Sequence, residues 1–271
     1  MTDLPKTTDA ELSFSDGVAT LAFDRDDVRN ALTGTALCDD ITATIDWANR
    51  TPEVAVLILT GKGSAFSSGG NVKEMRDRSG AFAGDVPALE TLYREGIQRV
   101  PLAMHDAAPV TIAAVNGPAI GAGCDLACMC DLRLGSSAAK FGETFVNLGI
   151  IPGDGGAWFL QRLIGYQAAA DMTFRGRIVG AEEAKAIGLL LDVTEPDRLL
   201  PRAGELASEI AAKPPQALRY AKRLMKLAQR MELPDFLGYC AMVQGVCHNT
   251  DDHLEAVNAF LDKRAPSFTG R

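Results

Sequence analysis

The stretch that decides the fold is Ala114-Val115-Asn116-Gly117-Pro118-Ala119-Ile120-Gly121-Ala122-Gly123-Cys124-Asp125. An apolar strand pattern, Val110–Val115, ends at Asn116-Gly117-Pro118, and small apolar residues then predict a buried helix over 119–130. The first backbone N–H groups of a helix have no acceptor inside it, and they carry a partial positive charge. The segment therefore predicts either close helix–sheet packing or a site that stabilises negative charge.

A second glycine-rich segment lies earlier in the chain, Ala65-Phe66-Ser67-Ser68-Gly69-Gly70-Asn71-Val72-Lys73-Glu74-Met75. It follows Val54–Thr60, a continuous apolar run that is typical of a buried parallel strand. Adjacent glycines let backbone N–H groups approach a ligand without hindrance from a Cβ atom. A plain turn would explain this segment alone, but the two segments together predict the two halves of an oxyanion hole.

The remaining pattern predicts an α/β protein. Leu12–Phe23 alternates around Asp16-Gly17, as in a β-hairpin, and strand and helix patterns then alternate as in a parallel sheet with crossover helices. One helix is expected over 88–107. After about Gly180 the strand signal nearly vanishes, and helices are expected over 198–212, 215–230, 234–247 and 251–264.

Composition limits the classes of partner and compartment. The formal net charge of −8 over 271 residues argues against nucleic acid as the main partner, because phosphate binding favours a basic surface. No apolar run reaches the ~20 residues of a membrane-spanning helix, and the N-terminus lacks the features of a signal peptide. We therefore expect no membrane association and a cytoplasmic protein. Cys124, Cys128 and Cys130 cluster in an apolar stretch without a nearby histidine, so we expect core packing and no metal site.

Several motifs in combination resemble the crotonase superfamily, also called the enoyl-CoA hydratase/isomerase family. They are the two glycine-rich segments, Arg29-Asn30-Ala31-Leu32, FGETFVNLGIIPGDGG at 141–156, GRIVGAEEAKAIGLL at 176–190 and AFLDKRAPSF at 259–268. The resemblance implies a crotonase (ClpP-like) spiral of stacked ββα units over residues 1–195. It implies a C-terminal helical trimerisation region over 196–271, and a homotrimer or a dimer of trimers.

The resemblance also implies an acyl-CoA substrate and no separate cofactor, because coenzyme A is part of the substrate. By position, the oxyanion donors would be the backbone N–H groups of Gly70 and Ala122. Positions matching substrate contacts in relatives are Arg29, Ala31, Ser68, Gly69, Lys73, Gly121, Phe145, Phe260 and Lys263, the last two reaching a neighbouring subunit's ligand.

The catalytic side chains depart from the pattern of the family's hydratases, which place two glutamates at the water site. Asp125 stands at the first of these positions, and the apolar Phe145 stands at the second. Glu143 and Asp154 are the other acids close in sequence. A pair from Asp125, Glu143 and Asp154 would serve enoyl-CoA hydration, which we expect. A single carboxylate would serve isomerisation or another crotonase reaction, and a non-hydrating acyl-CoA-binding paralogue stays open.

Overall fold

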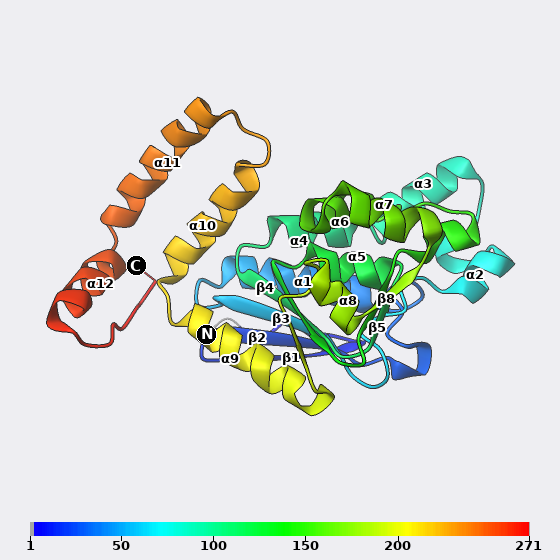
Figure 1. Cartoon of the computed structure of the whole chain (residues 1–271), viewed down its shortest axis with the longest axis horizontal. Helices are drawn as coiled ribbons and strands as arrows, with labels where there is room; N and C mark the ends of the chain where they lie inside the picture. Colours follow the sequence, from blue (N-terminus) through cyan, green and yellow to red (C-terminus); the bar gives the residue numbers. More distant parts are fainter. Residues whose placement is uncertain (1–2, 271) are drawn as a thin grey trace.

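The computed structural model describes residues 3–270. A six-stranded sheet forms its centre, in the order β1-β2-β3-β4-β6-β9 (Figure 1). The strands are β1 (Ala10–Ser15), β2 (Val18–Phe23), β3 (Val56–Gly61), β4 (Val110–Val115), β6 (Leu132–Ser136) and β9 (Asp192–Thr194). The hairpin β1–β2 is antiparallel and every later pair in this sheet is parallel, as the sequence predicted.

A second, three-stranded sheet lies beside the first and carries the turn after β4. Its strands are β5 (Pro118–Ile120), β7 (Lys140–Gly142) and β8 (Ile178–Gly180), in the order β5-β7-β8. The two sheets are linked where β4 passes through Asn116 and Gly117 into β5. This short link brings the segment that decides the fold to the edge between the sheets.

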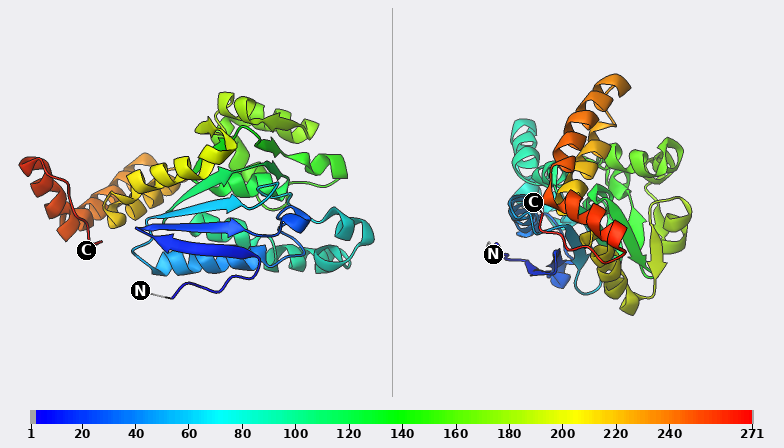
Figure 2. Two further views of the ribbon diagram at one scale, coloured as in Figure 1. Left: turned by 90° about the horizontal axis from the view of Figure 1, so that it is seen from below. Right: turned by 90° about the vertical axis from the view of Figure 1, so that its left-hand side faces the viewer.

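Helices cover both faces of the central sheet, because alternate residues of each strand point to opposite faces. Leu57 and Leu59 of β3 pack into the larger core with α1 (Leu37–Arg50), α4 (Arg99–Asp106) and α5 (Ala122–Met129). Val56 and Ile58 pack on the opposite face, under α9 (Leu199–Ala211), which lies across the sheet in Figure 2. The other helices of this part are α2 (Val72–Asp77), α3 (Val86–Glu95), α6 (Gly156–Ile164), α7 (Tyr166–Arg175) and α8 (Ala181–Ala186).

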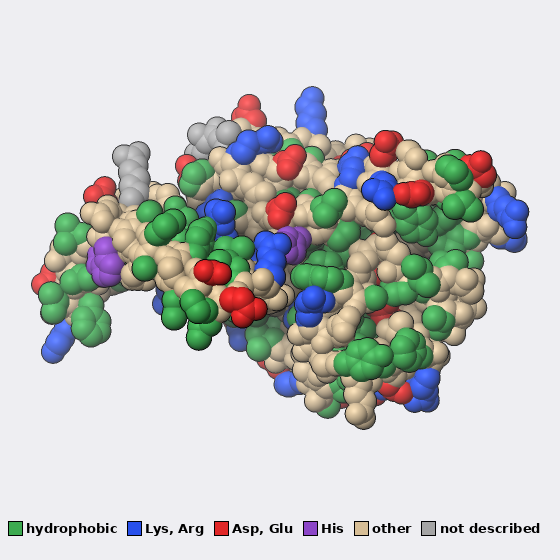
Figure 3. Space-filling model, turned by 90° about the horizontal axis from the view of Figure 1, so that it is seen from above, with side chains coloured by type: hydrophobic (Ala, Val, Ile, Leu, Met, Phe, Trp, Pro, Cys, Tyr) green, Lys and Arg blue, Asp and Glu red, His purple; other side chains and the backbone are tan. Residues whose placement is uncertain are grey.

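Three C-terminal helices project from this body, at the end opposite α2 and α3 (Figure 1). They are α10 (Pro215–Leu227), α11 (Leu233–His248) and α12 (Asp251–Asp262). Arg219 of α10 anchors them by donating from Nη2 to the carbonyl oxygens of Ala48 at 3.0 Å and Val54 at 3.0 Å. Apolar side chains gather on these helices (Figure 3), and the exposed ones are Met225, Leu233, Leu237, Met242, Val246, Leu254, Val257, Phe260 and Leu261.

The structure corrects several expected boundaries. The predicted helix over 88–107 is wrong as a single element, because the chain turns at Gly96 and forms α3 and α4. The predicted helix from Ala119 begins instead at Ala122, since Pro118–Ile120 pairs with β7. The sequence reasoning did not find α7 and β8. Among residues 3–270, no helix has both the length and the apolar character needed to cross a membrane.

Candidate active site

The two glycine-rich segments meet along their backbones. Ser67 and Ala119 form an isolated parallel bridge, in which Ile120 N donates to Ser67 O at 3.0 Å. A Cβ atom on Gly123 would lie well inside van der Waals contact with Ser67 O, so the first turn of α5 can approach the loop this closely only with glycine there. The close approach fixes the start of α5 against the loop that ends at Gly70.

Gly70 and Ala122 both border free space. Both residues line one cavity of about 300 Å³. Neither N–H donates a hydrogen bond to any residue from 3 to 270. Ala122 is the first residue of α5, where a backbone N–H has no acceptor within the helix. The cavity therefore receives two unpaired backbone donors, the arrangement that an oxyanion hole requires.

Asn30 ties the glycine-rich segment that begins at Ala65 to the end of β3, the strand before it. Its Nδ2 donates to Lys62 O at 3.0 Å and to Ala65 O at 2.9 Å, and its Oδ1 accepts from Arg25 N at 2.8 Å. Its φ of 53° is left-handed, a conformation that asparagine tolerates better than most residues. The sequence reasoning used Asn30 only as part of a motif and missed this structural role.

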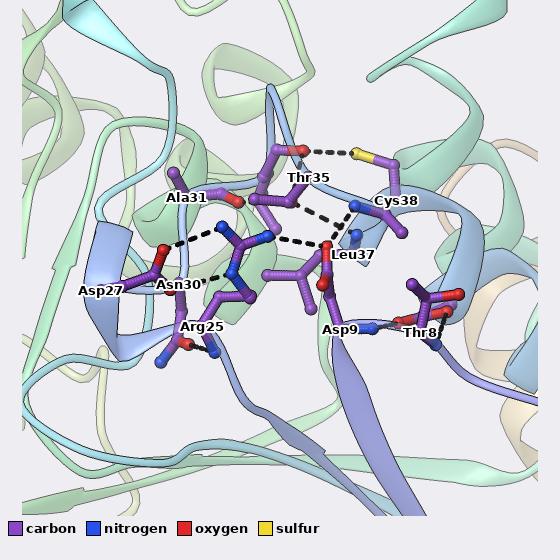
Figure 4. A network of polar contacts seen from close by, with 12 residues as sticks. Thr8, Asp9, Arg25, Asp27, Asn30, Ala31, Thr35, Leu37 and Cys38 are labelled. Carbon is purple, nitrogen blue, oxygen red and sulfur yellow. Dashed lines mark hydrogen bonds and ion pairs between the residues drawn. The ribbon is translucent and has the colours of Figure 1, made fainter.

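A polar network around Arg25 holds the segment that leads into α1 (Figure 4). Arg25 pairs with Asp9 at 3.1 Å and with Asp27 at 2.8 Å. Asp9 Oδ2 also accepts from Ala36 N at 2.6 Å, just before α1 begins. Since Thr35 and Cys38 line the cavity beside this network, it fixes one wall of the site.

Three carboxyl groups gather behind the oxyanion donors. Asp125 of α5 is 0% exposed, Glu143 after β7 is 1% exposed, and Asp154 in the turn before α6 is 4% exposed. Both side-chain oxygens of Asp125 and of Glu143, and Oδ2 of Asp154, find no donor among the described residues. A buried carboxylate without a hydrogen-bond donor or a cation raises the free energy of the folded state, and this cost falls when carboxyl groups of the cluster are protonated.

The pKa values of all three carboxyl groups are raised, and that of Asp125 is raised furthest. Burial raises the pKa of Asp125 well above its ordinary range, and the charge of Asp154 raises it further. Burial also raises the pKa values of Glu143 and Asp154, but for each of them a hydrogen bond with Asp125 works in the opposite direction. Each carboxyl group therefore influences the titration of the others, and the three titrate as a coupled cluster.

These shifts predict that the contribution of the buried carboxyl groups to stability falls as the pH rises from about 4. The folded protein holds protons on Asp125 and Glu143 that the unfolded chain releases, so their contribution is present below the unfolded pKa values and lost through the raised folded values. In urea unfolding at a series of pH values, Asp125→Asn with Glu143→Gln should flatten this fall. The exposed Asp16→Asn is the control. Equal slopes in the double variant and the parent would contradict the assignment.

Only one of the three carboxyl groups borders the cavity. Asp154 lines it, together with Phe145, whereas Asp125 and Glu143 are absent from its wall. Asp125 Oδ1 instead lies against Gly156, where a Cβ atom would collide with it. The ring of Phe145 lies 3.6 Å from the place a Cβ atom would take on Gly121. Asp154 is thus placed to exchange protons with a ligand, with Asp125 behind it.

The predicted substrate-binding residues fall into two groups. Gly69 and Gly121 are buried at the junction of the two segments, and Ala31 is buried close by. Ser68 N donates to Arg29 O at 2.9 Å, which joins the two motifs, while the side chains of Arg29 and Lys73 are exposed. Phe260, 83% exposed, and Lys263 lie on or just after α12, at the end of the molecule opposite α2 and α3 (Figure 1).

A second hollow of about 1060 Å³ continues from the cavity between α2, α3 and the 148–153 loop. Met75, Phe82, Tyr93 and Ile150 border both spaces. The sequence reasoning left this region open and missed Tyr93, because nothing in an amphipathic helix pattern marks one aromatic residue as facing a site. The site therefore has room for a ligand that extends beyond the 300 Å³ cavity.

The clustered cysteines are buried in the larger core, which confirms the packing prediction. Burial raises the pKa of Cys130 to about 12, so its thiol stays protonated. The six cysteines of the chain are all free thiols. None of the three clustered cysteines borders the 300 Å³ cavity.

Comparison with known proteins gives concordant matches. A family model described as "Enoyl-CoA hydratase/isomerase" matches residues 13–271. A crotonyl-CoA hydratase of Syntrophomonas wolfei is 35% identical over 255 residues, which is 94% of this chain and 95% of that protein. A short-chain-enoyl-CoA hydratase of Clostridium acetobutylicum is 34% identical over 91% of this chain and 92% of that protein. The crystal structure of an enoyl-CoA hydratase from Bacillus anthracis superposes with a TM-score of 0.90 at 30% identity, covering 97% of this chain and 100% of that one.

Proposed function

This chain belongs to the enoyl-CoA hydratase/isomerase family and has the crotonase fold, and we propose that it adds water to the double bond of a 2-enoyl-CoA. The observation that carries the proposal is the pair of unpaired N–H groups of Gly70 and Ala122, which border the same cavity as the Asp154 carboxyl. Relatives at 34–35% identity are named as enoyl-CoA hydratases, in support of the same reaction.

In the proposed reaction the thioester oxygen accepts hydrogen bonds from Gly70 and Ala122. Asp154 takes a proton from water as the water oxygen bonds to Cβ, and the electrons of the double bond move onto the thioester oxygen. The resulting enolate is stabilised by the two donors, whose orientation is fixed before the reaction. Asp154 then returns the proton to Cα and the carbonyl re-forms. Asp125 stays protonated, because its pKa is raised well above its ordinary range, and it leaves Asp154 to act as the base.

A second function, isomerisation of a 3-enoyl-CoA, is favoured by a specific observation. Asp154 is the one carboxyl of the cluster at the cavity wall, and the apolar Phe145 borders the cavity where hydratases carry a second glutamate. A single carboxylate could take a proton from Cα and return it at Cγ, with a dienolate between the two steps whose oxygen is held by the same two donors. Both reactions use the donors in the same way, so they differ in whether water enters.

Two exposed cations are the proposed contacts for the coenzyme A part of the substrate. Arg29 and Lys73 are exposed cations on the segments that flank the donors, and they suit the phosphates of coenzyme A, which is itself part of the substrate.

We propose that residues 196–271 form the contacts of a homotrimer or a dimer of trimers, supported by the exposed apolar residues of α10–α12. In that assembly Phe260 and Lys263 would reach a neighbouring subunit's ligand. Sedimentation would test this, since a monomer at micromolar concentration contradicts it.

We propose that residues 1–195 form the catalytic core and that the protein is cytoplasmic. The free thiols of the cysteines suit a reducing compartment. Helix α9 packs on the face of the central sheet that carries Val56 and Ile58, and this contact ties the start of the C-terminal region to the core.

The test of the reaction uses two substrates. The protein is incubated with crotonyl-CoA, and loss of the conjugated thioester absorbance reports hydration. A 3-enoyl-CoA is then supplied, and a gain of the same absorbance reports isomerisation. We expect hydration to be the faster reaction. Isomerisation without hydration would replace the first proposal with the second, and tight binding without either reaction would identify a non-hydrating acyl-CoA-binding paralogue.

A further inference from the structure

Tyr93 is a polar group at the cavity that neither the motifs nor the proposed reaction has used. It lies on α3, is half-buried, and borders both the 300 Å³ cavity and the adjoining hollow. Its hydroxyl group is not sealed from solvent and makes no hydrogen bond with any residue of the described range 3–270. A phenol that faces a cavity without a protein partner is a free donor and acceptor for a ligand or a water molecule.

The backbone places Tyr93 next to the turn that carries Asp154. A Cβ atom on Gly153 would lie 3.1 Å from Cε1 of Tyr93, so the ring rests against the residue before Asp154. Gln98 fastens the two segments, because its backbone N donates to Tyr93 O at 3.0 Å and its Nε2 donates to Gly153 O at 2.8 Å. Tyr93 and Asp154 therefore hold a fixed relation to each other.

The electrostatics agree with this placement. Burial raises the pKa of Tyr93, and the charge of Asp154 raises it further. The hydroxyl group thus keeps its proton and interacts electrostatically with the Asp154 carboxylate. A neutral phenol beside a carboxylate base can hold a water molecule that the base deprotonates, donating one hydrogen bond and accepting another.

We propose that Tyr93 positions the attacking water against Asp154, and so supplies at this site a polar contact that Phe145 cannot give. The inference rests on the proposed hydration reaction. Tyr93 exchanges no proton: the water O–H bond breaks toward Asp154, the water oxygen bonds to Cβ, and the phenol keeps its own hydrogen. In the reverse direction the same phenol holds the 3-hydroxyl group as it leaves.

The test compares two reactions of Tyr93→Phe, which keeps the ring and removes only the hydroxyl group. Hydration of crotonyl-CoA needs a positioned water molecule, whereas exchange of the α-protons of butyryl-CoA with D2O needs only the oxyanion donors and the base. We expect kcat for hydration to fall about 10- to 100-fold with little change in KM, because a hydrogen bond at a centre of developing charge is lost. Exchange should proceed as in the parent. Tyr166→Phe, at an exposed position on α7, is the matched control and should leave both reactions unchanged.

Three results would overturn the inference. Unchanged hydration in Tyr93→Phe would remove any role for the hydroxyl group in an active hydratase. Equal losses in hydration and exchange would show that Tyr93 acts on the base itself rather than on water. A rise in KM at constant kcat would assign Tyr93 to acyl binding. If instead the parent protein failed to hydrate any 2-enoyl-CoA, the proposed function would fail first, and that outcome is visible before the variant is measured.

Discussion

Replacing Asp154 by asparagine is expected to lower kcat for hydration by about 10²- to 10⁴-fold, the range of general acid–base catalysis. Asp154 is the carboxyl of the buried cluster that borders the cavity, and the amide of asparagine can neither take the proton of water nor return it to Cα. The two side chains have nearly the same shape, so KM should change little. Steady-state kinetics with crotonyl-CoA measure both constants.

The control for this variant is Asp125→Asn. Asp125 is completely buried away from the cavity and its raised pKa keeps it protonated, so a neutral asparagine preserves its charge state. We expect this variant to retain much more activity than Asp154→Asn. The reverse order, with Asp125→Asn inactive and Asp154→Asn active, would transfer the role of base to Asp125.

Replacing Ala122 by proline should lower kcat by about 10²- to 10³-fold, as found when one donor of an oxyanion hole is lost. Proline has no N–H group and so deletes the donor itself, which no side-chain substitution can do. Ala122 is the first residue of α5, and proline is well tolerated at the first position of a helix. Kinetics with crotonyl-CoA, alongside a circular dichroism spectrum, would measure the loss of donor and the integrity of the helix.

A matched substitution exists elsewhere in the chain. Ala181 also follows a glycine and opens a helix, α8, so Ala181→Pro makes the same chemical change away from the cavity. We expect Ala181→Pro to keep full activity. If Ala122→Pro folds like the parent and remains equally active, the assignment of Ala122 as an oxyanion donor is wrong.

The sequence predicted the class of the fold and the two glycine-rich segments because their signals are local. Buried parallel strands appear as continuous apolar runs, such as Val54–Thr60 and Val110–Val115, and glycine pairs mark backbone that approaches other groups closely. The motifs also identified the family, which the match over residues 13–271 confirms. These features depend on few residues at fixed spacing, so they need no knowledge of packing.

Which of the three carboxyl groups borders the cavity could not be predicted in this way. Asp125, Glu143 and Asp154 are equally acidic in the sequence, and only the packing of α5 against Gly156 places Asp125 behind Asp154. The break at Gly96 was equally hidden, because the helical pattern continues across it. Tyr93 meets the Asp154 turn through a contact between segments far apart in the chain, a distance that no local pattern reports.

The contact between Gly123 and Ser67 also bears on how such a site can evolve. Neither backbone can shift without moving the other, so the donor pair behaves as a single rigid unit. Position 125 lies on α5, positions 143 and 145 follow β7, and position 154 precedes α6, so none of these side chains belongs to the backbone contact itself. Side chains around the donor pair can therefore be exchanged while the backbone contact stays unaltered, which is how one fold could serve more than one of the proposed reactions.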